Sequence, residues 1–102
     1  MGDVTYIHKL DGNYLGFIYD GILFSRDGVN LGWMENDLVW DTTGKFRGVL
    51  IKVGSNNYIL RNILSLPPLP RTPKTVITPK QVFPPVPNIS AISPNIGFQD
   101  AF

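Results

Sequence analysis

Few residues in this chain of 102 are of types that perform chemistry. His8 is the only histidine, so a Ser-His-Asp or Cys-His site would have to use it. Cysteine is absent, which excludes disulfides and thiolate metal sites. Half of the eight carboxylates stand in turn sequences, where Asp bonds its own backbone: Asp11, Asp20, Asp27 and Asp37. We therefore predict no catalytic, metal-binding or cofactor-binding residues, and expect no enzyme.

Loops that hold ions are also missing. A calcium loop needs several oxygen ligands at alternating spacing, and neither an EF-hand nor a nonapeptide pattern occurs. The glycines recur at a structural period and do not lead into a helix, unlike those of a phosphate-binding loop. His8 occupies the place that Phe24, Trp40 and Leu60 occupy in the repeat described below, so we expect it to be a packing residue.

Aromatic residues are the better candidates for binding. Phe17 with Phe24, and Trp33 with Trp40, would be cross-strand pairs on one face, each worth roughly 0.5–1.5 kcal/mol beyond burial. Two interpretations stay open. The four side chains form a second layer of core, or they form a face that binds a sugar or a peptide, because Trp and Tyr dominate contact hot spots.

Charge and hydropathy argue against two classes of partner. Residues 1–66 hold six Lys/Arg against seven Asp/Glu, about −1, and residues 67–102 hold three against one, about +2. Neither value is the basic field of a nucleic-acid binder. Apolar runs are too short to span a membrane, so no membrane partner is predicted. Without cysteine or a secretion signal, we expect a cytoplasmic location.

A repeat of 16 residues positions the aromatic residues. The segment 11–16, Asp-Gly-Asn-Tyr-Leu-Gly, recurs at 27–32 and, more weakly, at 43–48. Its second glycine falls at Gly16, Gly32 and Gly48, and an apolar stretch follows each of them. A further short strand then joins each unit to the next.

Turn dipeptides predict how the strands pair. Asp20-Gly21 and Asp27-Gly28 are strong signals for two-residue hairpins, and Asn36-Asp37 is a weaker one. The first and third of these turns produce the two aromatic pairs. In the third unit, a turn at Gly54-Ser55 pairs Val49 with Leu60. That hairpin is longer by an even number of residues, so each side chain keeps its face.

Both faces of the predicted sheet are apolar. The inner face collects Ile7, Ile18, Leu23, Met34, Val39, Leu50 and Ile59, with Gly16, Gly32 and Gly48 letting strands crowd near an axis. The outer face collects Leu15, Phe17, Phe24, Leu31, Trp33, Trp40, Val49 and Leu60. Such a meander must cover both sides. We expect at least six short antiparallel strands over residues 4–62 and no helix longer than two turns.

These tandem Gly-x-x-x-Gly-aromatic and Asp-Gly motifs resemble the 4-fold β-flower proteins, as do the Pro-rich stretch and the terminus 98–102. The resemblance covers nearly the whole chain. The third repeat departs from it with Thr43-Gly44, and the fourth lacks its glycines. The resemblance implies an all-β fold of four short β-hairpin repeats around a pseudo-fourfold axis, and no transferable activity. A MORN-like array shares such hairpins but has a longer period.

We divide the chain into a β-repeat domain, residues 1–66, and a Pro-rich extended tail, residues 67–102. All nine prolines lie in the tail and favour polyproline II, a preformed ligand for aromatic grooves. We hypothesise that the tail docks on the outer aromatic face of its own or a neighbouring domain. The rival is a free arm, cut by trypsin at Arg71, Lys74 and Lys80.

The function predicted from these features is a non-enzymatic structural or protein-interaction module. The alternative is a ligand-binding module that uses Phe17, Phe24, Trp33 and Trp40 for a sugar or a peptide. Partners would be another protein or a second copy of the chain, so an oligomer is compatible with the sequence, and no cofactor is expected.

Overall fold

The computed structural model describes residues 4–78, 83–93 and 96–102. Regular structure in these residues consists of strands without a helix, which confirms the predicted all-β class. The strands are β1 (Val4–His8), β2 (Tyr14–Tyr19), β3 (Ile22–Ser25), β4 (Asn30–Glu35), β5 (Leu38–Asp41), β6 (Phe46–Val53), β7 (Asn56–Asn62) and β8 (Phe98–Asp100). Seven of them lie within residues 4–62, as the frequent turn signals predict.

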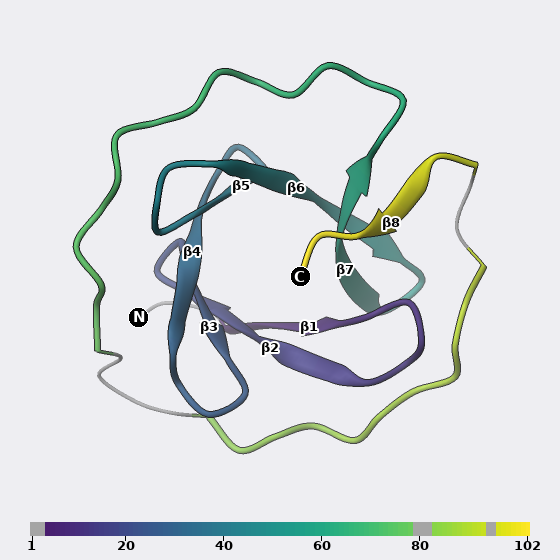
Figure 1. The fold of residues 1–102 in the computed structure, drawn as a ribbon. Helices are drawn as coiled ribbons and strands as arrows, with labels where there is room; N and C mark the ends of the chain where they lie inside the picture. Colours follow the sequence, from purple (N-terminus) through teal and green to yellow (C-terminus); the bar gives the residue numbers. More distant parts are fainter. Residues whose placement is uncertain (1–3, 79–82, 94–95) are drawn as a thin grey trace.

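The sheet closes into a barrel because its ends meet (Figure 1). Strands pair in chain order, all antiparallel, and β1 also pairs with β7 in parallel, Ile7 opposite Asn57. Further along the same strand, Leu60 of β7 pairs with Asp100 of β8. The edge of β7 is thus shared between the first strand and the last, which leaves little unpaired backbone there.

The sheet of the barrel consists of four strand–turn–strand units: β1–β2, β3–β4, β5–β6 and β7–β8. The turn glycines of the first three, Gly12, Gly28 and Gly44, have φ of 92°, 87° and 90°. Gly97, which directly precedes β8, has φ of 90° as well. The expectation that the fourth unit lacks both glycines is therefore wrong for the turn glycine, whereas Ala101 stands where the other units have their second glycine. Its glycine lies far along the chain, because residues 63–97 are inserted between its two strands.

The predicted hairpin registers are confirmed. Phe17 pairs with Phe24, Trp33 with Trp40 and Val49 with Leu60. Each aromatic pair lies on the two strands joined by a two-residue turn. Both residues of each turn have positive φ: Asp20 (53°) and Gly21 (76°) in the first, Asn36 (50°) and Asp37 (67°) in the second.

Asp27-Gly28 does not form a two-residue hairpin. Only Gly28 has positive φ there, and the pair lies in a longer loop in which the Ser25 amide donates to the Val29 carbonyl. The same loop form recurs in the first and third units, where Lys9 and Asp41 donate to the residue four positions on. This loop connects the two strands within a unit, and the tight turns connect one unit to the next.

A β-bulge follows each of these loops. Because of these bulges, the predicted assignment of side chains to the inner and outer faces is wrong at the bulged residues. Ile7 pairs with Gly16 but His8 with Tyr14, so Leu15 is the extra residue. Leu31 and Arg47 are the extra residues of the next two units. A bulge shifts side-chain parity locally. Leu15 and Leu31, predicted on the outer face, accordingly pack against the inner core of Ile7, Ile18, Leu23, Val39, Ile59 and Ala101.

The second glycine of each unit allows close approach of the next unit. A Cβ on Gly32 would collide with the carbonyl oxygen of Trp40, and one on Gly16 with that of Phe24. A Cβ on Gly48 would lie 2.6 Å from the Leu60 oxygen. All three glycines are buried. Strands therefore crowd at these positions, and the nearest atoms belong to the backbone of the neighbouring strand.

The described parts of the tail lie as extended chain around the outside of the barrel, and the last residues return to it (Figure 1). Its residues 98–100 form β8, a strand that the sequence analysis did not predict. Phe102 then packs against the inner core, and the chain ends near the centre of the view. Of the three predicted tryptic sites, Arg71 and Lys74 are described, whereas Lys80 lies outside the described residues.

Candidate functional site

The four aromatic residues singled out above form two close pairs on the outer side of the barrel. The rings of Phe17 and Phe24 lie 5.3 Å apart, and those of Trp33 and Trp40 are stacked at 6.1 Å with 17° between their planes. Phe46 joins the Trp pair edge-on at 5.9 Å. Each of the four predicted residues is 5% exposed or less. This aromatic face is therefore covered.

Two cations of the tail cover the Trp pair. The guanidinium carbon of Arg71 lies 4.5 Å from the ring centre of Trp40, and the ammonium of Lys74 lies 4.5 Å from that of Trp33. A cation over an indole ring is attracted by the negative face of the ring. Arg71 also pairs with Glu35 at 2.9 Å, although both side chains are about half exposed. The tail is thus held by charge as well as by apolar contact.

Backbone hydrogen bonds attach the tail at two turns of the barrel in the same pattern. Arg71 donates to the Gly44 carbonyl at 2.7 Å, and three residues later Lys74 donates to Thr42 at 3.1 Å. At the first unit, the Ile89 amide donates to Gly12 at 2.8 Å, and three residues later the corresponding bond is Ile92 to Leu10 at 2.9 Å. Gly12 and Gly44 are two repeats apart, so equivalent turns bind equivalent stretches of tail.

Glycine is required at both turns for a second reason besides its positive φ. A Cβ on Gly12 would collide with the carbonyl oxygen of Ile89, and one on Gly44 with that of Arg71. The sequence analysis missed this role. The turn alone explains both glycines, so their second use leaves no separate signal in the sequence.

Between and beside these attachments, side chains of the tail contact the first two units. Phe83 packs edge-on against Phe17 at 5.3 Å and, in a tilted arrangement, against Tyr19 at 5.4 Å. The Nε2 of His8 donates to the Pro87 carbonyl at 3.0 Å. His8 is buried, as expected of a packing residue, and it also holds the tail. The Asn88 side chain accepts from the Tyr14 amide, and that of Asn30 from the Ile77 amide.

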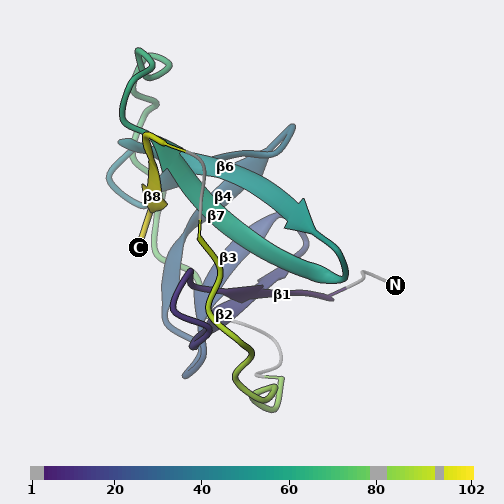
Figure 2. The same ribbon diagram turned by 90° about the vertical axis from the view of Figure 1, so that its right-hand side faces the viewer.

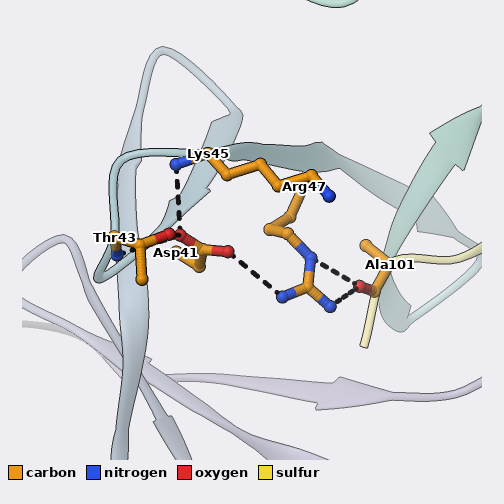
Figure 3. Close-up of polar contacts among 5 residues, drawn as sticks. All are labelled: Asp41, Thr43, Lys45, Arg47 and Ala101. Carbon is orange, nitrogen blue, oxygen red and sulfur yellow. Dashed lines mark hydrogen bonds and ion pairs between the residues drawn. The ribbon is translucent and has the colours of Figure 1, made fainter. Parts of the chain in front are cut away.

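The last strand is held by Arg47 (Figure 3). Its Nε and Nη2 donate to the Ala101 carbonyl at 3.1 and 2.6 Å, and its guanidinium lies 4.3 Å from the Phe102 ring centre. Nη1 pairs with Asp41 at 3.3 Å. Arg47 stands where the first two units have Leu15 and Leu31. The repeat is therefore broken at the position that faces the returning chain.

Asp41 organises the turn beside Arg47. One carboxylate oxygen accepts from the amides of Thr43 and Lys45 and from the Thr43 hydroxyl (Figure 3). Burial raises the pKa of Asp41, but hydrogen bonds from Thr43, Lys45 and Arg47 outweigh it and leave the pKa below 3.8. The carboxylate is thus ionised when it holds the turn that Arg71 and Lys74 bind.

A cavity of about 270 Å³ lies between the tail and strands β3 and β4. Trp33 and Ile22 give it apolar walls, and Asp20, Asn30 and Lys74 give it polar ones. Among the residues that the structure describes, no group of three His, Asp or Glu side chains could hold a metal ion. No described helix is long and apolar enough to cross a membrane.

Comparison with known proteins identifies one family. A family model described as "4-fold beta flower protein" matches residues 1–97. That match covers all of the barrel strands before β8 and most of the tail. Neither a curated protein nor a solved structure matches the chain.

Proposed function

We propose, from the premise that this chain belongs to the 4-fold beta flower family, that it is a non-enzymatic interaction module whose outer face binds an extended, basic, Pro-containing peptide. Its own tail is the resident occupant. The paired cation contact carries the proposal: Arg71 on Trp40 and Lys74 on Trp33, each at 4.5 Å.

Recognition through backbone and ring faces suits an extended peptide. The tail presents amides to the carbonyls of Gly44 and Thr42 and cations to the two indoles, three residues apart. Polyproline segments are already extended and lose little conformational entropy on docking. A partner with an Arg-x-x-Lys pattern between prolines would make the same contacts.

Such a partner must compete with the tail. A tethered ligand acts at an effective concentration of roughly millimolar, so a partner of equal intrinsic affinity binds weakly while the tail is docked. The docked tail therefore inhibits binding of a partner peptide at the same site. A partner gains access when it offers more contacts than the tail, or when the tail is itself captured by another protein.

The experiment weakens the resident occupant and supplies the peptide separately. The full chain carrying Arg71→Glu and Lys74→Glu is titrated with a peptide of residues 70–78, and binding is followed by fluorescence. Trp33 and Trp40 are the only two tryptophans and both lie at the site. We expect a Kd of about 10–100 μM for the variant and at least about tenfold weaker binding to the unaltered chain.

A matched variant, Arg26→Glu with Lys52→Glu, makes the same charge change at two exposed residues outside the turn that Arg71 and Lys74 bind. It should behave like the unaltered chain. A peptide with glutamate in place of both cations should not bind. Equal binding of the two peptides, or no binding to the weakened variant, would overturn the proposal.

The cavity beside Trp33 favours a second candidate, a sugar-binding module. Lys74 covers the Trp33 ring, so a sugar would have to displace this side chain in order to stack on the indole and bond to Asp20 and Asn30 beside it. Titration with simple hexoses, read by fluorescence and repeated with Asn30→Ala, tests this. Binding that Asn30→Ala abolishes supports the sugar site, and no response up to about 100 mM excludes useful affinity.

As part of the same proposal we place the protein in the cytoplasm and expect no nucleic-acid partner. The absence of cysteine supports the cytoplasmic location, and a net charge of only +1 supports the expectation of no nucleic-acid partner. A fluorescent fusion and a gel-shift assay at low salt test these two statements separately.

A further inference from the structure

A second surface, which adjoins the proposed peptide site at Phe46, is open. Immediately after β7, residues 63–69 carry four large aliphatic side chains that face solvent: Leu66 is 96% exposed, Leu69 84%, Leu64 73% and Ile63 55%. In Figure 2 the loop that follows β7 projects beyond the sheet. Scattered exposed apolar residues are ordinary, but four within seven positions mark a contact surface.

A groove lies directly beside this loop. It has a volume of about 350 Å³, and its lining includes Phe46, Val49 and Ile51 of β6 with Phe98 of β8. Leu66 and Pro67 of the loop line it as well. Of the described residues that line it, Arg61 alone is charged. The groove is thus an apolar receptor of a size that one or two aliphatic side chains would fill.

We propose that this surface binds a second copy of the chain, with Leu66 and Leu69 of each copy in the groove of the other. A projection and a groove that adjoin on one chain are self-complementary under a twofold rotation, which is how most homodimers are built. The inference does not depend on the proposed peptide function.

The chemistry of the loop favours a second copy. Residues 62–70 carry no charge, so two loops meet across a twofold axis without like-charge repulsion. Pro67, Pro68 and Pro70 have no N–H, so the loop cannot add to a sheet edge and must associate through side chains. Arg61 lines the groove, and Arg is enriched at protein interfaces relative to the rest of the surface.

Sedimentation velocity of the full chain tests the dimer. Between about 1 μM and about 1 mM we expect the mean mass to rise from 11.4 kDa toward twice that value, as befits a weak contact. Leu66→Asp should hold the chain at 11.4 kDa throughout. Val76→Asp, an equally drastic change at an exposed tail residue that does not line the groove, should dimerise like the unaltered chain.

Disulfide cross-linking is a second test of the dimer. Because the chain has no cysteine, Ser65→Cys at the groove should form disulfide-linked dimers on mild oxidation, and Val76→Cys should do so at least about tenfold more slowly. A chain that stays monomeric at the highest concentration overturns the proposal, as does dimerisation of Leu66→Asp at the level of the unaltered chain. Both results would leave the peptide titration at Trp33 and Trp40 unaffected.

Discussion

The guanidinium of Arg71 lies 4.5 Å from the ring centre of Trp40 and 2.9 Å from a carboxylate oxygen of Glu35. Trp40 is buried, whereas Arg71 and Glu35 are about half exposed. Water screens the ion pair more than it weakens the ring contact. We therefore expect the aromatic contact to be the stronger of the two contacts that the Arg71 side chain makes.

Substitutions separate these two contacts. Arg71→Ala should lower the free energy of unfolding by about 1 kcal/mol, because it removes a cation from an indole face. Glu35→Gln should lower it by no more than about 0.5 kcal/mol, as for other surface pairs. Urea unfolding measures both. If Glu35→Gln were as destabilising as Arg71→Ala, the ion pair and not Trp40 would hold this part of the tail.

Crowding at the repeated glycines predicts a large effect of one methyl group. Gly32→Ala should destabilise by about 3 kcal/mol, since its Cβ meets the Trp40 carbonyl and the backbone must shift. Gly54→Ala is the control, because φ is 61° there but no atom lies within 4 Å of the added carbon. Only conformational strain, about 1 kcal/mol, is expected. Equal thermal shifts for both variants would mean that Gly32 is not a packing position.

The low pKa of Asp41 predicts how its contribution varies with pH. The folded pKa is below the ordinary 3.8, so the carboxylate stabilises the fold fully above 3.8, and this stabilisation is lost as pH falls through the folded value. At neutral pH, Asp41→Asn should cost about 1–3 kcal/mol, as it weakens bonds to Thr43, Lys45 and Arg47. Denaturant titrations at several pH values should show this difference shrinking below pH 3.8. A difference that stays constant in acid would contradict the role of the charged form.

Arg47 predicts local loosening of β8. Arg47→Leu restores the residue type of Leu15 and Leu31 but leaves the buried Ala101 carbonyl without its two donors. Exchange of the Ala101 amide, which donates to Ile59, should accelerate about tenfold. Arg47→Lys retains one donor and should fall between the two. Unchanged exchange in Arg47→Leu would show that packing of Phe102 alone holds the strand.

Local turn chemistry explains how much of the fold could be predicted. Asp20-Gly21 and Asn36-Asp37 adopt the left-handed conformation at both positions, which sets the registers of both aromatic pairs. The bulges could not be predicted in this way. Leu15 and Gly16 are compatible with either face, so alternation alone does not show where an extra residue stands.

The fourth unit shows a different limit. Leu60 of β7 pairs with Asp100, 40 residues later, and nothing near β7 announces its partner. Phe98-Gln99-Asp100 is too short for a strand signal by itself. The candidate site was predicted in part, because Phe17, Phe24, Trp33 and Trp40 stand out by type. The turns at Gly12 and Gly44, which bind the tail backbone, could not be predicted as part of the site. The positive φ of each turn already explains its glycine, so nothing further pointed to a contact with the tail.

Amide hydrogen exchange in the unaltered chain tests most directly whether the tail occupies the aromatic face. The amides of Arg71 and Ile89 donate to Gly44 and Gly12, whereas that of Val76 has no protein acceptor among the described residues. We predict that Arg71 and Ile89 exchange at least about tenfold more slowly than Val76 after correction for intrinsic rates. Exchange of all three at the rate of an unstructured chain would contradict the account, because the tail would then be a free arm and the aromatic face would be open.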